Sequence, residues 1–305
     1  MNKDKLNKMK PHEVLEHPEV KERFVKIHNH THKSSEGELF YEEEKLNLLK
    51  VIASDTKGKL QSCSGFSVYS TFIDLASTGL SCKIQSNPLI YIQSRGVKNG
   101  NEWTQAMTMT ISPYGELSLR IMLGHILYAD QPTIVYEGDS FQPYEEKGGK
   151  FIDYKPQIPR KSKIIIAGYL KLTRHNNSVD YAYMLPEDWE HLATYSERQN
   201  SFGNKKGNAN ALYTSNNGQI DPGFLKAKLI KHAFKNYPKI KLSAYAKLSE
   251  NEEYQASDYH LESDPDVSQT PMPDQKQKPF ESSAPKIEKV DDGINIDIGD
   301  DDTPF

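Results

Sequence analysis

Apolar and polar residues recur with two periods along the chain, and each period predicts a different kind of element. Apolar residues three or four positions apart predict helices over 39–55, 67–78, 186–198 and 221–237. Gly79 supplies a left-handed stop for the second of them. Alternating residues predict two hairpins, with strands over 82–95 and 103–111 and over 163–174 and 179–185. The pattern indicates an α+β fold in which antiparallel β-hairpins pack with helices.

The stretch from 111 to 141 joins a helix start, a helix, a turn and a strand in unbroken order. Ser112 can cap the helix, and Pro113 can occupy its first position. Arg120 is the only strong cation on this helix, and we expect it to face an anionic partner. Gly138 permits a positive φ after the β-rich run 133–136. The apolar positions that predict the buried side of this helix are Leu117, Ile121 and Leu127.

The two ends of the chain lack such periods. Residues 1–38 are polar, which favours a flexible N-terminal arm. His28, His30 and His32 stand at alternate positions, so on a strand they would face one way and could hold a divalent metal. A solvated arm is the interpretation that we favour. Residues 249–305 are acidic and rich in Pro, Ser and Gln, which predicts a disordered tail and leaves 39–248 as the folded body.

Charge is segregated along the chain, although its net value is only -4. The tail from 249 to 305 holds 16 acidic and 4 basic residues, a balance of -12. The remaining 34 basic and 26 acidic residues give residues 1–248 a balance of +8. This asymmetry is typical of a body that binds a polyanion and a tail with a separate task.

Composition also limits the compartment and the chemistry. No apolar run approaches the length of a membrane span and the N-terminus lacks an apolar signal core, so we expect a cytoplasmic protein without membrane contact. Cys63 and Cys82 are expected to be reduced thiols, and without a CxxC spacing they do not predict a zinc site.

Cations on the predicted elements mark candidate contacts with a phosphate backbone. The tip of the first hairpin carries Arg95 and Lys98 beside Tyr91 and Trp103, so it could grip phosphates and stack on bases. An ordinary exposed hairpin tip is the alternative. In the helix 221–237, lysines lie opposite the apolar side formed by Leu225, Leu229, Ala233 and Phe234, and a solvated basic face is the alternative there. The candidate contact residues are Arg95, Lys98, Arg120, Lys161, Lys163, Lys171, Arg174, Lys205, Lys206, Lys228, Lys231 and Lys235.

Motifs for hydrolytic or ATP-driven chemistry are absent from the sequence. There is no GxxxxGK[ST] phosphate loop, no GxSxG and no HExxH. Glu137 and Asp139 form one carboxylate pair, and with the histidines at 28–32 they leave a metal-dependent nuclease as a minor hypothesis. We interpret Glu137 and Asp139 as residues that shape the strand exit. We therefore predict no catalytic residue, no resident metal and no ATP, although a divalent cation could modulate DNA binding.

The order of several segments resembles the RecT family of phage-type single-strand annealing recombinases. These segments are Phe40-Tyr-Glu to Leu49, Leu60-Gln-Ser-Cys63, residues 67–80, Tyr114-Gly-Glu, Val135-Tyr-Glu-Gly-Asp-Ser-Phe141 and residues 223–238. The resemblance spans about 39–240, and Ser112-Pro-Tyr-Gly115 stands where many members have Gly-Tyr-Lys-Gly. It implies an ATP-independent protein of DNA recombination and repair that coats single-stranded DNA, anneals complementary strands, forms a ring or filament, and works beside an exonuclease. A single-stranded DNA-binding or replication accessory protein that does not anneal is the alternative.

The last six residues resemble the acidic tip of bacterial single-stranded DNA-binding proteins, with Thr303 where Ile is common. The resemblance implies that the tip docks on a host replication or repair protein. Two alternatives are a tail that folds back on the cationic body and one that only keeps the protein in solution. The residues expected to bind the partner are Asp300, Asp301, Asp302, Pro304 and Phe305.

Overall fold

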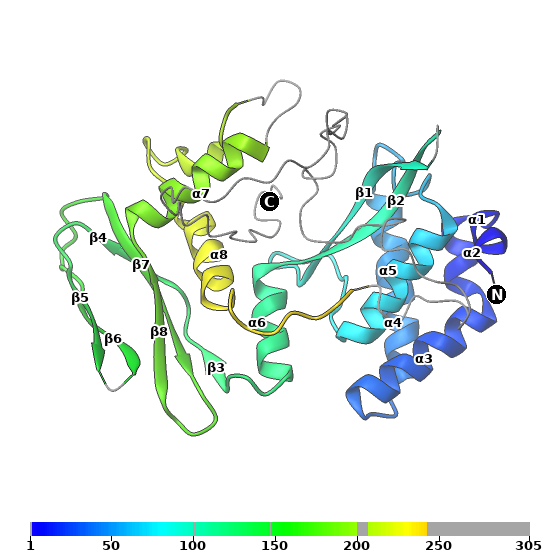
Figure 1. Ribbon diagram of the computed structural model, residues 1–305, viewed down its shortest axis with the longest axis horizontal. Helices are drawn as coiled ribbons and strands as arrows, with labels where there is room; N and C mark the ends of the chain where they lie inside the picture. The colour runs from blue at the N-terminus through cyan, green and yellow to red at the C-terminus, as the bar shows by residue number, and fades with distance from the viewer. Residues whose placement is uncertain (1, 100–101, 147, 200–206, 243–305) are drawn as a thin grey trace, which may run out of the picture. The chain divides into compact units, whose positions relative to one another are not determined.

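The computed structural model describes residues 2–99, 102–146, 148–199 and 207–242, and Figure 1 shows the arrangement of their elements. The acidic tail 249–305, with its expected partner-binding tip, lies outside the described residues. The helices are α1 (Lys3–Asn7), α2 (Pro11–Glu16), α3 (Pro18–His32), α4 (Gly37–Ser54), α5 (Gly65–Thr78), α6 (Pro113–Met122), α7 (Pro186–Gln199), the 3-10 helix η2 (Ala211–Tyr213) and α8 (Pro222–Ala233).

The strands of the described residues form three antiparallel sheets. The first is the hairpin of β1 (Ile90–Asn99) and β2 (Glu102–Ile111), and another hairpin joins β5 (Ser140–Glu146) to β6 (Gly149–Lys155). The remaining sheet contains β3 (Tyr128–Ala129), β4 (Thr133–Tyr136), β7 (Ile165–Thr173) and β8 (Val179–Met184), with β7 at its centre. The structure thus confirms the α+β class and both hairpins expected from the sequence.

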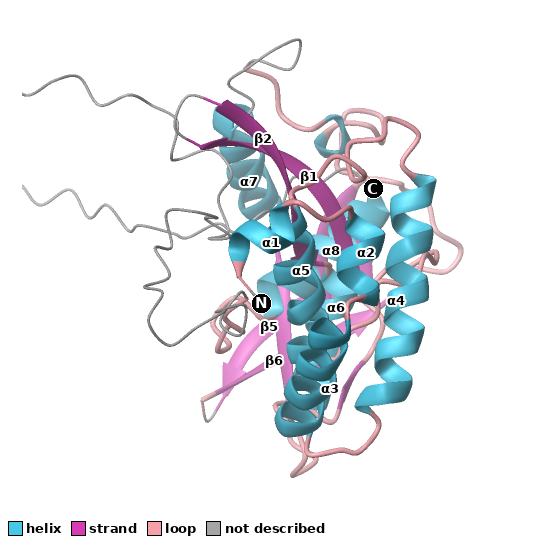
Figure 2. Cartoon of the chain, turned by 90° about the vertical axis from the view of Figure 1, so that its right-hand side faces the viewer, coloured by secondary structure: helices cyan, strands magenta, loops and turns pink. Residues whose placement is uncertain are grey.

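Helix α5 is the centre of the largest hydrophobic core, and every residue from 65 to 78 is buried. The Ser64 side chain caps its first turn by accepting a hydrogen bond from the backbone N–H of Ser67. Gly79 ends it with a φ of 67°, as predicted. Figure 2 shows α1 to α4 gathered around α5, and β2 also packs on it.

The first 38 residues are part of this core, so the structure corrects the expectation of a flexible N-terminal arm. They form α1, α2, α3 and the start of α4. Val20, Phe24 and Ile27 lie one helical turn apart on α3 and are buried, with the Phe24 ring 4.5 Å from the Phe72 ring. Polar residues on the outer face outnumber this short apolar stripe, so the average composition of residues 1–38 is polar and suggested a flexible arm.

The histidines of this segment lie on a helix rather than on a strand. His28 is buried on α3, stacks on Phe40 at 4.6 Å and lies 4.7 Å from the His32 ring. His32 Nε2 is 3.1 Å from the carbonyl oxygen of Ala76. On a helix, residues two positions apart do not share one side, so the arrangement that the metal hypothesis required is not formed. No cluster of metal-binding side chains occurs among the described residues.

Helix α8 covers one face of the sheet centred on β7. Leu225, Leu229 and Phe234 are fully buried, which confirms the apolar side predicted for this helix. A side chain at Gly168 of β7 would lie 2.7 Å from Leu229, so the glycine lets helix and sheet approach closely. The other face of the sheet is covered by the β5–β6 hairpin, where Phe141 and Tyr154 pack on Tyr169 at 6.1 and 5.5 Å.

The buried side of α6 differs from the predicted one. Ile121 and Leu127 are 42% and 40% exposed, whereas Leu119 and the charged pair Glu116 and Arg120 are buried. The start of the helix is as predicted, because the Ser112 side chain accepts a hydrogen bond from Gly115 N–H and Pro113 occupies the first position. None of the helices described is long and apolar enough to cross a membrane.

Candidate nucleic-acid interface

The β1–β2 hairpin is anchored at one end and projects at the other. On β2, Met107 donates its N–H to Ser67 Oγ at 2.9 Å and accepts from Thr71 Oγ1 at 3.1 Å. The last such contact with α5 and its cap is the 2.8 Å hydrogen bond from Ser64 N–H to the carbonyl oxygen of Gln105. The tip of the hairpin extends beyond this anchor.

The tip presents one aromatic ring and one cation side by side. Trp103 is 61% exposed and pairs directly with Lys98, so both side chains emerge on the same face of the hairpin. Gly96 leaves room beside the ring, since a side chain there would lie 3.5 Å from Trp103. An exposed indole next to a lysine suits a base stacked on the ring and a phosphate bound to the ammonium.

The other two residues predicted at the tip lie elsewhere. Arg95 pairs with Ala106 and therefore belongs to the opposite face of the hairpin from Lys98 and Trp103. Tyr91 pairs with Thr110 at the base of the hairpin, where burial raises the pKa of its hydroxyl and Tyr114 adds to the effect. The strand register could not be read from the sequence, because it depends on where the turn is placed.

A second cationic surface is the loop from Lys155 to Ile164, between β6 and β7. Lys161 and Lys163 are exposed, as predicted for phosphate contacts, and neither makes an ion pair with another described residue. Arg160 lies with its guanidinium carbon 3.8 Å from the centre of the Tyr136 ring. Lys161 and Lys163 were predicted contacts, whereas Arg160 was not among the predicted residues.

Asp139 ties this loop to the end of β4. Its carboxylate accepts hydrogen bonds from Tyr136 N–H (3.0 Å), Tyr154 Oη (3.1 Å) and Gln157 N–H (2.8 Å). Burial alone would raise the pKa of this carboxyl group, but the three donors, with nearby Arg160, hold the pKa below its ordinary value. Both carboxylate oxygens accept a hydrogen bond, which supports the structural interpretation of Glu137-Gly-Asp139.

On the β7–β8 hairpin the two predicted cations are already paired. Lys171 Nζ lies 3.5 Å from an Asp130 oxygen, and that carboxylate raises the pKa of the lysine. Arg174 Nη2 donates to Asp180 at 2.9 Å. These residues could contact a phosphate only in competition with their carboxylate partners, so they are weaker candidates than Lys161 and Lys163.

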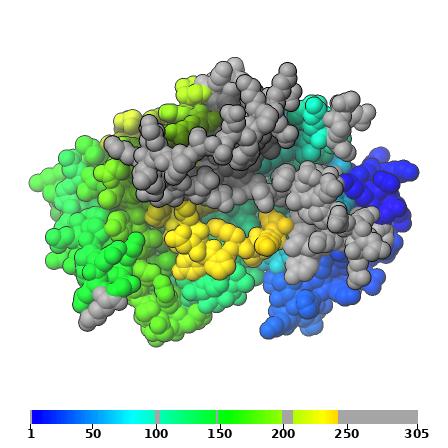
Figure 3. All heavy atoms as spheres, in the orientation of Figure 1, coloured from blue at the N-terminus to red at the C-terminus, as the bar shows by residue number. Residues whose placement is uncertain are grey.

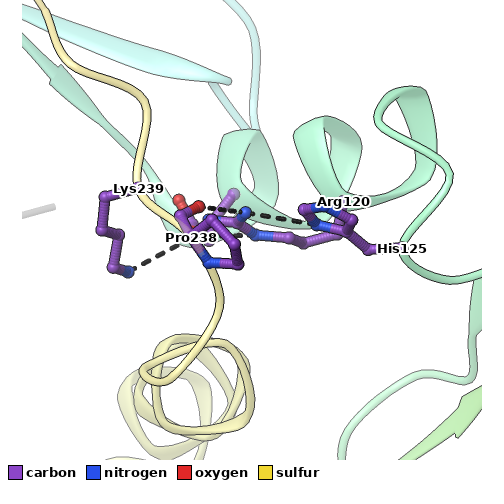
Figure 4. Close-up of polar contacts among 5 residues, drawn as sticks. Arg120, His125, Pro238 and Lys239 are labelled. Carbon is purple, nitrogen blue, oxygen red and sulfur yellow. Dashed lines mark hydrogen bonds and ion pairs between the residues drawn. The ribbon is translucent and has the colours of Figure 1, made fainter.

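Arg120 does not face a ligand, and this corrects the sequence prediction. The side chain is 1% exposed and forms an ion pair with Glu116, one turn earlier on α6. Figure 4 shows its guanidinium beside Pro238, whose carbonyl oxygen accepts a 2.6 Å hydrogen bond from Nη1. Lys239 also approaches Glu116, at 3.3 Å. The one strong cation on α6 is thus used to attach the segment after α8.

The three lysines predicted as one basic face of the helix 221–237 are in different environments, and Lys235 lies beyond α8, which ends at Ala233. Lys228 is 3% exposed, with its ammonium 4.7 Å from the Phe224 ring and 5.6 Å from the Tyr213 ring. Lys231 is half-buried and Lys235 is exposed. The prediction is therefore wrong for Lys228, because η2 lies over that side of the helix and covers it.

Comparison with known proteins adds no assignment. No family model and no curated protein matches the chain.

The structure adds cations that the sequence analysis did not select. Lys239 and Lys241 follow α8, and both are exposed. Figure 3 shows this yellow segment at the surface of the molecule. The exposure of Lys239 and Lys241 could not be inferred from periodicity, since both residues lie beyond the end of the helix. Lys205 and Lys206, which were also predicted contacts, lie outside the described residues.

Proposed function

We propose that the protein binds single-stranded DNA and anneals complementary strands without ATP, as a recombinase of the RecT type in the cytoplasm. The observation that carries the proposal is the exposed Trp103 beside Lys98 at the tip of a firmly anchored hairpin. The resemblance of the segment order over 39–240 to the RecT family gives the same class of activity.

An annealing protein must hold a strand while leaving its pairing edges accessible. Lysines bind the phosphates electrostatically, and a ring stacks on the face of a base rather than on its Watson–Crick edge. The exposed Lys98 of the hairpin tip, Lys161 and Lys163 of the loop and Lys241 after α8 are suited to the first task, and Trp103 is suited to the second. Neither task requires nucleotide hydrolysis or a resident metal.

The proposal includes partners as well as a ligand. In line with the resemblance, we propose a ring or filament of many copies, an exonuclease that supplies the single strand, and a host replication or repair protein that binds the C-terminal tip. The residues of that tip are Asp300, Asp301, Asp302, Pro304 and Phe305, in a tail whose charge balance is -12. Removal of Thr303 to Phe305 should abolish capture of the partner and leave DNA binding intact.

The test is an annealing assay at low salt with two complementary oligonucleotides carrying a donor and an acceptor dye. Nucleotides and divalent metals are omitted, and a non-complementary pair is the control. The proposal expects faster pairing with the protein than without it. Equal rates would contradict annealing, and a strand that is bound but shielded from its complement would identify the non-annealing alternative. Strand cleavage after addition of Mg²⁺ or Mn²⁺ would instead identify a nuclease.

A further inference from the structure

The loop from Lys155 to Ile164 has a sequence and an exposure pattern that its packing does not explain. It contains Lys155, Arg160, Lys161 and Lys163 and no acidic residue. Between the first two of these cations stands Ile158, which is 85% exposed and is the most exposed of the large apolar side chains described. An isoleucine this exposed contributes almost nothing to the core, so its side chain is available for contact with a ligand.

The loop is held at several points, so Ile158 is presented from a fixed frame. Asp139 accepts the hydrogen bond from Gln157 N–H, directly before Ile158, at 2.8 Å. The Arg160 guanidinium packs on Tyr136 and lies 3.9 Å from an Asp139 oxygen. The loop is therefore attached to the end of β4 on both sides of Ile158.

A further pair of contacts closes the far end of the loop. Ser162 Oγ donates to Glu137 Oε2 at 2.8 Å, and Glu137 N–H donates to the carbonyl oxygen of Ile164, also at 2.8 Å. Gly138 separates the two carboxylates with a φ of 93°, and a side chain there would meet Gln157 Oε1. Asp139 thus holds the part of the loop around Ile158, and Glu137 holds the end of the loop at Ser162 and Ile164.

We infer that Ile158 contacts the face of an unpaired base in single-stranded DNA, and that Asp139 positions the loop that carries it. The loop combines four cations with two exposed apolar side chains, Ile158 and Ile164, and this combination matches the chemistry of a single strand, in which phosphates alternate with apolar base faces. A purely apolar protein partner would leave Lys161 and Lys163 without a counter-charge. In duplex DNA the base faces are stacked on one another, so the contact would carry an unstacking cost there that unpaired bases do not impose. The inference rests on the proposed function and adds to it a base-contacting residue that the sequence analysis did not select.

The first experiment compares Ile158→Ser with Ile84→Ser, a matched control at another exposed isoleucine (62% exposed) that also has a neighbouring lysine. The probe is a fluorescent oligothymidylate, with binding read from anisotropy across a range of salt concentrations. Loss of the apolar contact should weaken binding roughly five- to tenfold and leave the salt slope unchanged, because no charge is removed. Ile84→Ser should bind like the unmodified protein.

An abasic oligonucleotide of the same length separates a base contact from any other effect. It keeps the phosphates and lacks the bases, so Ile158→Ser and the unmodified protein should bind it equally. Equal affinities of the two proteins for oligothymidylate, or an equal loss on both probes, would overturn the role of Ile158. If the unmodified protein binds neither probe, the proposed function itself fails. If it binds and anneals while Ile158→Ser is unchanged, only this inference fails.

The positioning role of Asp139 is tested by a double-mutant cycle. Asp139→Asn should weaken binding of oligothymidylate several-fold in the unmodified background. In a protein that already carries Lys161→Ala and Lys163→Ala, the same change should have a smaller effect, because the loop it positions has lost two of its phosphate contacts. A general effect on folding would be the same in both backgrounds and would overturn the positioning role. Circular dichroism of each variant checks that it is folded.

Discussion

Arg120 on α6 donates a 2.6 Å hydrogen bond to the carbonyl oxygen of Pro238, 118 residues later in the chain. The same guanidinium is paired with Glu116 and lies 5.6 Å from the Tyr237 ring. Arg120 therefore fixes the chain as it leaves α8, directly before the exposed Lys239 and Lys241. Arg120 was predicted to contact a ligand, but it has a structural role instead. It holds the backbone at Pro238 in place and does not itself face a ligand.

Replacing Arg120 with Met tests this tie. The change leaves Glu116 buried with only Lys239 nearby and removes the donor to Pro238, so the free energy of unfolding should fall by about 3–5 kcal/mol. Urea unfolding followed by circular dichroism gives the value. Arg174→Ala is the control, because its pair with Asp180 is exposed and should be worth about 0–1 kcal/mol. Similar losses in the two variants would show that Arg120 is not a buried tie.

Gly115 offers a second stability test at the start of α6. A side chain at this position would lie 1.9 Å from the carbonyl oxygen of Leu89, which belongs to the backbone and cannot rotate away. Gly115→Ala should therefore destabilise the protein by at least about 1–3 kcal/mol, the usual range for overpacking a buried site. Gly96→Ala is the control, since the nearest atoms there are at 3.5 Å, an ordinary contact distance. Equal unfolding midpoints for the two variants would contradict the close approach.

These sites show what local sequence rules can and cannot predict. The cap at Ser112, the stop at Gly79 and the positive φ at Gly138 were predicted correctly, because each depends on a few neighbouring residues. The helices and both predicted hairpins were also found, since their periods are local. The β5–β6 hairpin was not among the predicted elements, because its packing on β7 involves residues outside the segment.

The burial of charged residues could not be predicted from periodicity. Arg120 and Lys228 occupy helix faces that look polar, yet both are buried by partners far along the chain or in an irregular segment. The residues that carry the resemblance have structural tasks in this chain: Gly115 permits a close approach, Glu116 pairs with Arg120, and Asp139 holds the basic loop. Residues that carry a sequence resemblance can thus have structural tasks, while the exposed cations lie elsewhere.

The buried histidine of α3 makes stability depend on pH. Burial lowers the pKa of His28 below its ordinary value, and His32 adds to the effect, whereas Asn29 and Glu36 oppose it. As pH falls below about 6.5, the unfolded chain takes up a proton at this site that the folded protein resists. The stabilising contribution of the neutral ring is therefore complete above that pH and is lost as pH falls through the lower pKa of the folded state.

His28→Phe should remove this contribution, because phenylalanine can keep the stacking on Phe40 without a titrating group. We expect the urea midpoint of the unmodified protein to fall between pH 7.5 and pH 5.5 and that of the variant to fall less. His30→Phe, at an exposed position on the same helix, should behave like the unmodified protein. An unchanged pH dependence in His28→Phe would assign the effect to other groups.

Lys228 within α8 and Lys235 just after it give a prediction in which two lysines of the predicted basic face behave differently. Lys235→Ala removes an exposed charge and should lower the slope of log affinity against log salt by about 0.7, the value for one phosphate contact on a single strand. Lys228→Met should leave the slope unchanged, because that ammonium is covered by Phe224 and Tyr213. Salt titrations of oligothymidylate binding measure both, and a lower slope for Lys228→Met would contradict its assignment as buried.

Trp103 allows the proposed stacking to be observed directly, because the protein has only two tryptophans and the other, Trp189, is 6% exposed. In a Trp189→Phe protein the emission reports on the hairpin tip alone, and a saturating oligonucleotide should quench it as a base stacks on the indole. In Trp103→Phe the remaining buried tryptophan should show no quenching. Trp103→Ala should weaken binding by about 1–3 kcal/mol, the range for one base stacked on a ring. If the emission of Trp189→Phe does not change while anisotropy reports binding, the strand passes elsewhere and the hairpin tip is not the interface.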